Sequence, residues 1–417
     1  MEKSGKFRLT SLERNWILYD VGNSAFVLMV ATLIPIFFNA LAAAGGLSSV
    51  EYLAYWGYAS SAVTVITAVL SPILGTVADT KGFKKPIFIL CVFVGIVGCC
   101  AMGAASAWLP FLVIFVIAKV GFSGSLVFYD SMLSDVTTPE RMDEVSSRGY
   151  AWGYIGSCVP FVVCLGLVLG AGSIGISQMT ALNLALLLTA AWWLLTTLPL
   201  LKSYKQLHYV EVEKHAVRQS FARIGHTLRH LPEDKQVFWF LLAFFCYIDG
   251  VYTIIDMATA YGTALGLDTT GLLLALLVTQ IVAFPSALVF GRLSNKYPSA
   301  KLIPVCIAAY AGIAVFAFFL TRQWQFWVLA VIVGMFQGGV QALSRSHFAK
   351  IIPPEKSGEY FGLFDICGKG ASFLGTMIVS VGSQLTGSAN VGVGSLIVLF
   401  IVGFVLFRVS FRQGETV

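Results

Sequence analysis

Eight charged side chains lie inside stretches of sequence that are otherwise almost entirely apolar. A charge near the centre of a lipid bilayer costs about 2.5–3.5 kcal/mol on insertion scales, so each one needs a partner, a water-filled cavity or a function. Carboxylates, ammonium groups and guanidinium groups in such places pair with one another, bind ionic substrates or carry protons. The eight residues are Asp20, Lys119, Asp130, Asp249, Asp256, Arg345, Asp365 and Lys369.

The apolar stretches that hold these charges predict a membrane protein. Charged residues make up 12% of the chain and hydrophobic residues 57%, whereas a soluble globular chain has roughly 25% charged residues. A helix that spans a bilayer needs roughly 20 mostly apolar residues. Twelve such stretches predict an all-α membrane protein, and they cover residues 16–42, 51–78, 86–107, 109–133, 149–171, 179–201, 237–263, 269–292, 301–320, 324–350, 359–385 and 389–411. The first is too long for a secretory signal and contains Asp20 and Asn23.

The positions of lysine and arginine predict the topology. These residues favour the cytoplasmic side of short loops, and nearly all of them lie on the side that both termini share. We therefore expect both termini in the cytoplasm, in a protein of the cell membrane. The net charge of +6 then follows from topology, so no nucleic-acid partner is needed.

One long basic connection divides the spans six and six. We expect an N-terminal six-helix bundle (1–201), a cytoplasmic linker (202–236) and a C-terminal six-helix bundle (237–417). The linker is interpreted either as a solvated tether or as a partly helical segment along the inner membrane surface. Its histidines, interpreted as surface residues and not as ligands, are His208, His215, His226 and His230.

The two groups of spans carry traces of a duplication. LSDVTTPE (133–140) aligns with FAKIIPPE (348–355) at an offset of 215 residues. The stretch 291–301, after span eight, similarly resembles 75–85, after span two, at an offset of 216, with Asn295 in the place of Asp79. Parallel repeats of six helices, related by an axis along the membrane normal, are the plan of one large transporter class.

The stretch GTVADTKGFKK (75–85) has the spacing GxxxDxxGxKK. Gly75 permits a close helix approach and Gly82 a tight turn, while Asp79 can face the positive N-terminal end of a neighbouring helix or an arginine. An ordinary positive-inside loop would explain the lysines but not the spacing of the glycines and the aspartate.

This spacing resembles the signature of the major facilitator superfamily, and Gly75, Asp79, Gly82, Lys84 and Lys85 carry the match. The resemblance implies a conformational clasp that latches the two halves together in the outward-open state. The chain departs from the pattern at Thr80, where a basic residue is common.

Six further segments resemble the vacuole-effluxer-like branch of that superfamily, which is named for a fungal autophagy-related amino-acid effluxer. They are WILYDVGNSAF (16–26), FYDSML (128–133), VSSRGYAWGYIGS (145–157), DGVYTIIDMATAYG (249–262), GGVQALSRS (338–346) and GEYFGLFDICGKG (358–370). The resemblance implies that spans one, four, seven and ten line a central cavity, and it favours export. Six of the eight intramembrane charges fall on those four spans.

Polar residues at helical spacing on these spans predict the substrate site. We expect it to contain Asp20, Asn23, Lys119, Asp249, Tyr252, Asp256, Gln337 and Gln341. At ~1.5 Å per residue, Lys119 and Asp249 lie near the midplane, whereas Asp20, Asp130 and Arg345 lie near the cytoplasmic mouth.

Three roles are assigned to the deeper charges. Lys119 and Asp249 either grip the carboxylate and ammonium of a zwitterion or pair with each other across the halves. Asp256 has no evident partner and is the candidate proton carrier. Asp365 and Lys369 have the i, i+4 spacing of an intrahelical ion pair.

The sequence thus predicts a monomeric secondary transporter that works by alternating access and exports amino acids or similar small zwitterions. Protons are the candidate coupling ion. The alternative is proton-coupled transport of an amphipathic drug or lipid, which cavity aromatics would suit. The motifs HExxH and GxSxG are missing from the sequence, so we expect neither an enzyme nor catalytic residues.

A channel would need a pore-loop segment, which the short outer loops cannot hold. The eight cysteines all fall in predicted spans with no CxxC pair, so we interpret them as packing residues and expect no metal or other cofactor.

Overall fold

The computed structural model describes residues 7–211, 227 and 229–414. The N-terminal half contains helices α1 (Ser11–Ala31), α2 (Leu33–Ala44), α3 (Ser49–Ala78), α4 (Lys84–Ala104), α5 (Trp108–Ser131), α6 (Leu133–Val136), α7 (Met142–Leu169) and α8 (Gln178–Ser203). The C-terminal half contains α10 (Lys235–Ala264), α11 (Thr269–Leu293), α12 (Ser299–Phe318), α13 (Gln323–Ile351), a short 3-10 turn (Pro354–Lys356), α14 (Ser357–Thr386), α15 (Ala389–Gly394) and α16 (Ile397–Gly414).

These helices match the expected twelve spans. Eleven segments of the described chain are long and apolar enough to cross a membrane, and α14 adds a helix of 30 residues, about 45 Å long at ~1.5 Å per residue. Two spans are interrupted. The first changes direction at Thr32, whose backbone lies outside the helical region, and the last is divided between α15 and α16.

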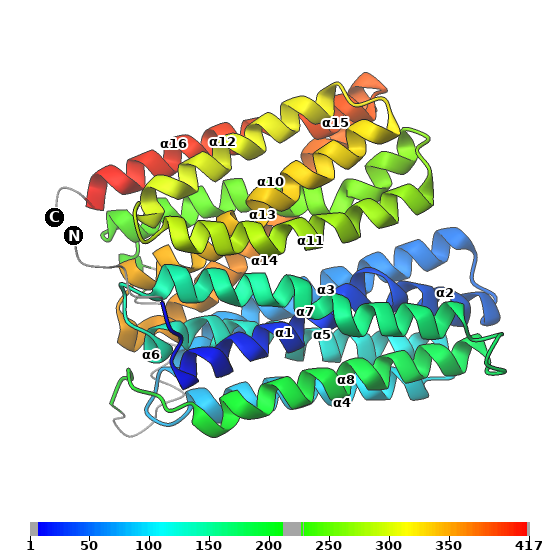
Figure 1. The fold of residues 1–417 in the computed structure, drawn as a ribbon, viewed down its shortest axis with the longest axis horizontal. Helices are drawn as coiled ribbons and strands as arrows, with labels where there is room; N and C mark the ends of the chain where they lie inside the picture. The colour runs from blue at the N-terminus through cyan, green and yellow to red at the C-terminus, as the bar shows by residue number, and fades with distance from the viewer. Residues whose placement is uncertain (1–6, 212–226, 228, 415–417) are drawn as a thin grey trace.

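The helices run back and forth between two ends of the molecule (Figure 1). The start of α1 and the end of α16 lie at the same end, which we call the terminal end, and the other is the distal end. The halves pack against each other mainly through α3 with α14, α7 with α11 and α7 with α13. Their ribbons lie together at the terminal end and diverge toward the distal end (Figure 1).

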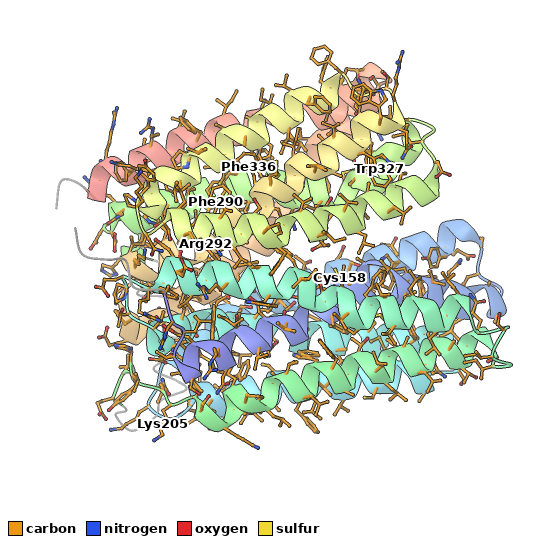
Figure 2. The ribbon with its side chains drawn as sticks, in the orientation of Figure 1. Cys158, Lys205, Phe290, Arg292, Trp327 and Phe336 are labelled. Carbon is orange, nitrogen blue, oxygen red and sulfur yellow. The ribbon has the colours of Figure 1, made fainter. Side chains whose placement is uncertain are left out.

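The side chains are arranged as a bilayer requires. Large apolar residues such as Leu195 and Val163 are exposed on the outer helix faces, where lipid replaces water as the solvent. Inside, aromatic residues bridge neighbouring helices, as Phe290 of α11 and Phe336 of α13 do with ring centroids 6.1 Å apart (Figure 2). All eight cysteines are free and at least partly buried, which confirms their interpretation as packing residues.

Candidate substrate site and closing contacts

A buried arginine joins the two halves near the terminal end. Arg345 of α13 is 2% exposed. Its Nη1 lies 2.9 Å from Asp130 Oδ1 on α5 and 3.6 Å from Asp20 Oδ2 on α1. Its Nε and Nη2 donate to the hydroxyl and the carbonyl of Ser146 on α7, at 2.9 and 3.0 Å. One side chain of the C-terminal half therefore binds three helices of the N-terminal half.

Aromatic rings enclose this guanidinium. We call Arg345, Asp20, Asp130 and Ser146 together the Arg345 cluster. The guanidinium carbon lies 4.3 Å from the ring centroid of Tyr150, 4.7 Å from that of Trp16 and 5.4 Å from that of Tyr129. Tyr129 also donates its hydroxyl to Asp20 at 3.1 Å. Cation–π contacts and charge-assisted hydrogen bonds are both strengthened where water is excluded, so these rings hold the cluster in one geometry.

The cluster lies where the two repeats meet. Asp130 and Arg345 are 215 residues apart, the offset that aligns LSDVTTPE with FAKIIPPE. They therefore occupy equivalent positions in the two halves, and equivalent positions that touch must lie beside the axis relating the halves. The repeat alignment contained this signal, because it places opposite charges at matched positions.

The Asp79 clasp is the second connection between the halves. The Asp79 carboxylate accepts hydrogen bonds from the backbone N–H groups of Gly358 and Glu359, at 2.7 and 2.8 Å, in the first turn of α14. This confirms the expectation that Asp79 faces a helix N-terminus, where the helix dipole and free N–H groups favour an anion. Lys84 completes the contact, because its Nζ donates to Ser357 Oγ at 2.8 Å and lies 3.5 Å from Asp79 Oδ1.

The glycines of the clasp have the geometry that their spacing predicts. A Cβ at Gly75 would lie 2.2 Å from the carbonyl oxygen of Gly358, so α3 and α14 can approach this closely only with glycine there. Gly82 has a φ of 81°, in the left-handed region that glycine adopts without cost. Lys85 points away from α14 and its Nζ lies 3.5 Å from the carbonyl oxygen of Tyr204.

Burial makes Asp79 a weaker acid here than an exposed aspartate is. Asp79 and Lys84 are both 0% exposed. Loss of hydration raises the pKa of Asp79 to about 6, although the Lys84 charge and the two backbone N–H groups oppose the rise and the nearby Glu359 adds to it.

A mirror contact stands at the equivalent place across the axis. Asn295, after α11, donates from Nδ2 to Glu144 Oε2 at 3.1 Å, in the first turn of α7. A Cβ at Gly291 would lie 2.8 Å from Ser147 Cβ, so α11 and α7 also approach closely. The decayed copy of the clasp sequence thus forms a contact of its own between the halves.

The first part of the linker covers the clasp. Val210 forms an isolated bridge with Thr80, and Gln206 accepts from the Gly82 N–H and donates to the Ala78 carbonyl, both at 3.0 Å. Residues 204–211 of the linker are not helical, whereas residues 227, 229 and 230, farther along the linker, are helical. Residues 212–226 and 228, which include His215 and His226, lie outside the described residues.

One linker histidine has a specific partner. His208 is only partly exposed, and its Nδ1 lies 2.9 Å from Asp135 Oδ1. Asp135 also accepts from the backbone N–H groups of Leu207 and His208, at 3.2 and 2.9 Å, and from the Tyr204 hydroxyl. His208 thus lies at the surface, with its side chain 36% exposed, and Asp135 holds it against the end of α6.

Three of the predicted site residues lie beside the Arg345 cluster. Asp20 belongs to it, and Asn23 Nδ2 donates to the Tyr19 carbonyl at 3.0 Å and lies 3.5 Å from Asp20 Oδ1. Gln341 Oε1 accepts from the Tyr154 hydroxyl at 2.7 Å, across the halves. A fourth residue, Tyr252 of α10, is partly exposed and within electrostatic range of Asp130.

The predicted pairing of Lys119 with Asp249 is wrong. Asp249 is 0% exposed. Both of its oxygens accept from the Gly375 N–H of α14 at 2.9 Å, and Oδ1 also accepts from Thr253 at 3.2 Å. In a regular helix the Gly375 N–H would donate to the carbonyl four residues earlier. Because α14 and α10 both belong to the C-terminal half, Asp249 binds a backbone group of its own half and not Lys119.

Lys119 interacts electrostatically with Asp256 of the opposite half. Asp256 lies two turns beyond Asp249 on nearly the same face of α10, but it is exposed. Lys119 is partly exposed and lies over the ring of Phe122, with its Nζ 4.7 Å from the centroid. The prediction that Asp256 has no partner is therefore also wrong.

The remaining two expectations concern Gln337 and Asp365. Gln337 lines a separate apolar pocket inside the C-terminal half. Asp365 accepts from Ser71 Oγ of α3 at 2.9 Å, which adds another contact between the halves. The side chain of Lys369, its expected intrahelical partner, lies outside the described residues.

The helices and their contacts define a twelve-span membrane protein of two halves, and comparison with solved structures shows that its fold is that of the major facilitator superfamily. The structure superimposes on the human organic anion transporter MFSD10 (TETRAN) with a TM-score of 0.71 and 14% identity, covering 95% of this chain and 98% of the other. It superimposes on FucP in the outward conformation with a TM-score of 0.71 and 16% identity, covering 96% and 97%.

The chain belongs to the family described as vacuole effluxer Atg22 like, whose model matches residues 11–140 and 134–416. It is 42% identical to the uncharacterized MFS-type transporter YxiO of Bacillus subtilis (strain 168), over 98% of this chain and 96% of that protein. It is 25% identical to autophagy-related protein 22 of Coccidioides immitis (strain RS), over 65% of this chain and 51% of that protein. The chain therefore spans about half the length of this fungal relative.

Family membership also accounts for where the site lies. The segments that carry the resemblance supply Asp20, Asp130, Ser146 and Arg345 to the cluster. They also supply Gly358 and Glu359 to the clasp. These segments thus supply residues to the contacts that join the two halves at the terminal end.

Proposed function

We propose that the chain is a secondary active transporter that works by alternating access and exports amino acids or similar small zwitterions. The observation that carries this proposal is the concentration of hydrogen bonds and ion pairs between the halves at the terminal end. Contacts that can break together, at one end of a two-part molecule, are what a rocking carrier requires. The word effluxer in the family description supports export.

The proposed substrate chemistry rests on two charges that come from opposite halves. Lys119 comes from the N-terminal half and Asp256 from the C-terminal half, and both are accessible to solvent. A zwitterion presents a carboxylate to the ammonium and an ammonium to the carboxylate. It would therefore satisfy both charges at once and connect the halves.

Protons are the proposed coupling ion, and the Arg345 cluster is the proposed place where they act. Asp20 and Asp130 share one guanidinium, so with both acids ionised the buried group has an excess of one negative charge. One proton removes that excess. Because Arg345 also bridges the halves, a change in its partners would alter the contact that keeps the terminal end closed.

The proposed orientation places the terminal end, where the two halves are joined, in the cytoplasm of a cell-membrane protein. A cysteine introduced at Gly46, in the distal loop after α2, should then react with an impermeant thiol reagent in intact cells. One introduced at Leu207, in the linker, should react only after permeabilisation. The reverse pattern would contradict the orientation.

Counterflow of labelled amino acids in proteoliposomes tests the transport function. Unlabelled substrate inside the vesicles should drive transient accumulation of labelled substrate above equilibrium. The reason is that a carrier exposes its binding site to one side of the membrane at a time and so exchanges an internal molecule for an external one. A channel would give simple equilibration, and that result would overturn the proposal.

A double-mutant cycle tests the substrate site. Lys119→Ala and Asp256→Ala should show non-additive losses of substrate binding. The matched pair Lys119→Ala and Asp249→Asn should be additive, because Asp249 bonds to Gly375 instead. Additivity in both cycles would mean that Lys119 and Asp256 do not share a substrate.

A further inference from the structure

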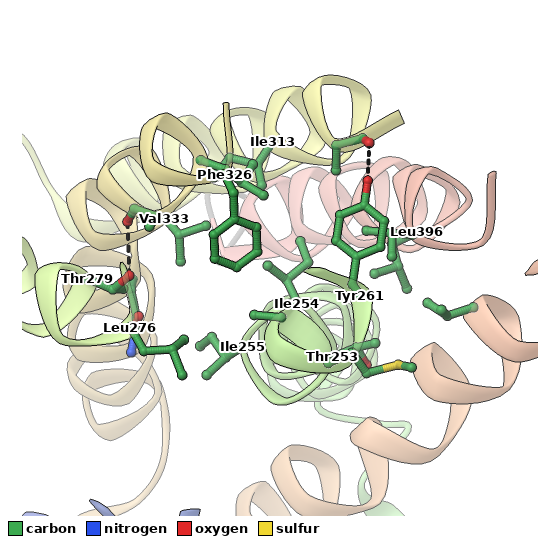
Figure 3. Close-up of a pocket in the computed structure, with 18 of the residues that line it drawn as sticks. Thr253, Ile254, Ile255, Tyr261, Leu276, Thr279, Ile313, Phe326, Val333 and Leu396 are labelled. Carbon is green, nitrogen blue, oxygen red and sulfur yellow. Dashed lines mark hydrogen bonds between the residues drawn. The ribbon is translucent and has the colours of Figure 1, made fainter. Parts of the chain in front are cut away.

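An apolar pocket lies inside the C-terminal half, toward the distal end, and none of the described residues that line it is charged. It is enclosed by α10, α11, α12 and α13, together with Val379 of α14, Val393 of α15 and Leu396, which lies between α15 and α16 (Figure 3). About 690 Å³ of space not filled by protein atoms lies within it, part of which is open to the outside. Its walls are mainly aliphatic and include Ile254, Leu276, Ile313, Phe326, Val333 and Leu396.

Most of the polar groups around the pocket are already bonded to the protein. The Tyr261 hydroxyl donates to the Ala317 carbonyl at 2.6 Å (Figure 3). The Thr279 hydroxyl contacts the carbonyls of Ala275 and Ala330, at 3.0 and 3.2 Å. These groups therefore offer little to a ligand except shape.

Gln337 differs from them. Its side chain lines the pocket and is 5% exposed, and its amide oxygen has no hydrogen-bond partner among the described residues. A buried acceptor without a donor is unfavourable, so a ligand donor that reaches this oxygen would gain a hydrogen bond.

We propose that the pocket binds an uncharged, mostly aliphatic molecule whose single hydroxyl or amide N–H donates to Gln337 Oε1. The aliphatic walls bind the body of such a molecule by excluding water. The lack of a charged group in the lining excludes an ionic ligand, because its charge would be buried without a counter-charge. This site goes beyond the proposed function, because it takes a neutral ligand and because neither Lys119 nor Asp256 is among the described residues that line it.

The probe for this site is a photoreactive octanol with a diazirine on its alkyl chain, applied to the full purified chain. Mass spectrometry after irradiation should find adducts on the pocket faces of α10, α11 and α13. Plain octanol should compete roughly three- to tenfold better than methyl octyl ether, which lacks the donor, because one neutral hydrogen bond gives a difference of about that size. Equal competition by the two compounds would overturn the proposal.

Two variants connect the labelling to the pocket. Gln337→Leu should keep the adducts but remove the preference for the alcohol over the ether. Ala330→Phe should fill the space and abolish the adducts, with thermal unfolding checked to show that the variant folds. The matched control is Val120→Phe, which fills a second apolar pocket between α3, α4 and α5 and should leave labelling of the C-terminal half unchanged.

The same experiment distinguishes a specific site from lipid-like partitioning. Adducts spread over the lipid-facing surfaces of both halves, insensitive to Ala330→Phe, would overturn the proposal. Because binding is read at equilibrium without transport, failure here and failure of the proposed transport function give separate results.

Discussion

The Asp79 clasp and the mirror contact occupy equivalent places on the two sides of the axis, but they use different chemistry. In the clasp, a fully buried carboxylate accepts from the backbone at the start of α14 and pairs with a fully buried lysine. In the mirror contact, an exposed amide donates to the side chain of Glu144 at the start of α7. One copy of the duplicated loop thus keeps a buried charge, and the other has a neutral, solvated group.

The difference indicates how closure is divided between the two sides. Removing one partner of a buried ion pair leaves the other charge buried and unpaired, which costs several kcal/mol of stability. Losing a hydrogen bond from an exposed group costs little, because water can take the place of the lost partner. We infer that the clasp side contributes most of the free energy of closure. This contribution depends on the protonation of Asp79. The Arg345 cluster lies between them, beside the axis.

Removing Arg345 should weaken closure on both sides of the axis. Arg345→Gln leaves Asp20 and Asp130 without their shared cation, and breaking a buried pair in this way costs about 3–5 kcal/mol. We expect a large drop in the thermal unfolding temperature and loss of closure at the terminal end. A variant that unfolds at the temperature of the natural protein would contradict the role given to the cluster.

The control uses the equivalence of the two positions. Exchanging the charges, Asp130→Arg together with Arg345→Asp, keeps one cation and two carboxylates in the cluster. It should recover part of the stability that Arg345→Gln loses. Failure of the exchange together with full stability of each single variant would show that the two residues do not depend on each other.

Asp79→Asn should open the clasp but leave substrate affinity nearly unchanged. The amide offers one acceptor oxygen to two N–H groups, and its NH2 group then faces one of them, whereas both oxygens of a protonated carboxyl can still accept. Hydrogen bonds to charged groups contribute about 1.5–3 kcal/mol. Spin labels at Phe83 and Glu355, both exposed, should report a longer distance. A large loss of equilibrium binding in a folded variant would refute the role of a clasp remote from the site.

Acidification should favour the closed clasp. The closed form holds Asp79 with its pKa raised to about 6, whereas an opened, hydrated Asp79 has a pKa near ~3.9. The closed form therefore binds more protons between these values. Its population should rise as the pH falls from 7 to 5, by roughly tenfold. The same spin-label pair measures this.

Asp79→Asn is the control for the pH effect, because the amide cannot titrate. In that variant the distance between the labels should change much less with pH, although Glu359 and Lys84 remain beside position 79. An unaltered pH dependence would assign the titration to another group.

Asn295→Ala should have the smallest effect of the series. Asn295 is exposed, and the buried Glu144 keeps its ion pair with Arg148 at 2.7 Å, so we expect a change of about 0.5–1 kcal/mol or less. Spin labels at Glu140 and Lys296 should report nearly the natural distance. An effect as large as that of Asp79→Asn would mean that the two sides share the work of closure equally.

Much of this molecule could be predicted from its sequence. Hydropathy alone places the twelve spans within a few residues, because a bilayer demands long apolar helices whatever their neighbours. The geometry of the clasp was also predictable, since the spacing of Gly75, Asp79 and Gly82 is a local property of one loop and the helix end that it meets.

The pairing of the deep charges was decided by tertiary structure. Asp249 and Asp256 share nearly one face of α10, so helical periodicity cannot separate their roles. Gly375 allows α14 to approach Asp249 closely and bury it, while Asp256 stays exposed opposite Lys119. Likewise, which wall Gln337 faces depends on how α10, α11 and α13 pack. A sequence specifies which residues share a helix face, but the neighbouring helices determine which of them meet.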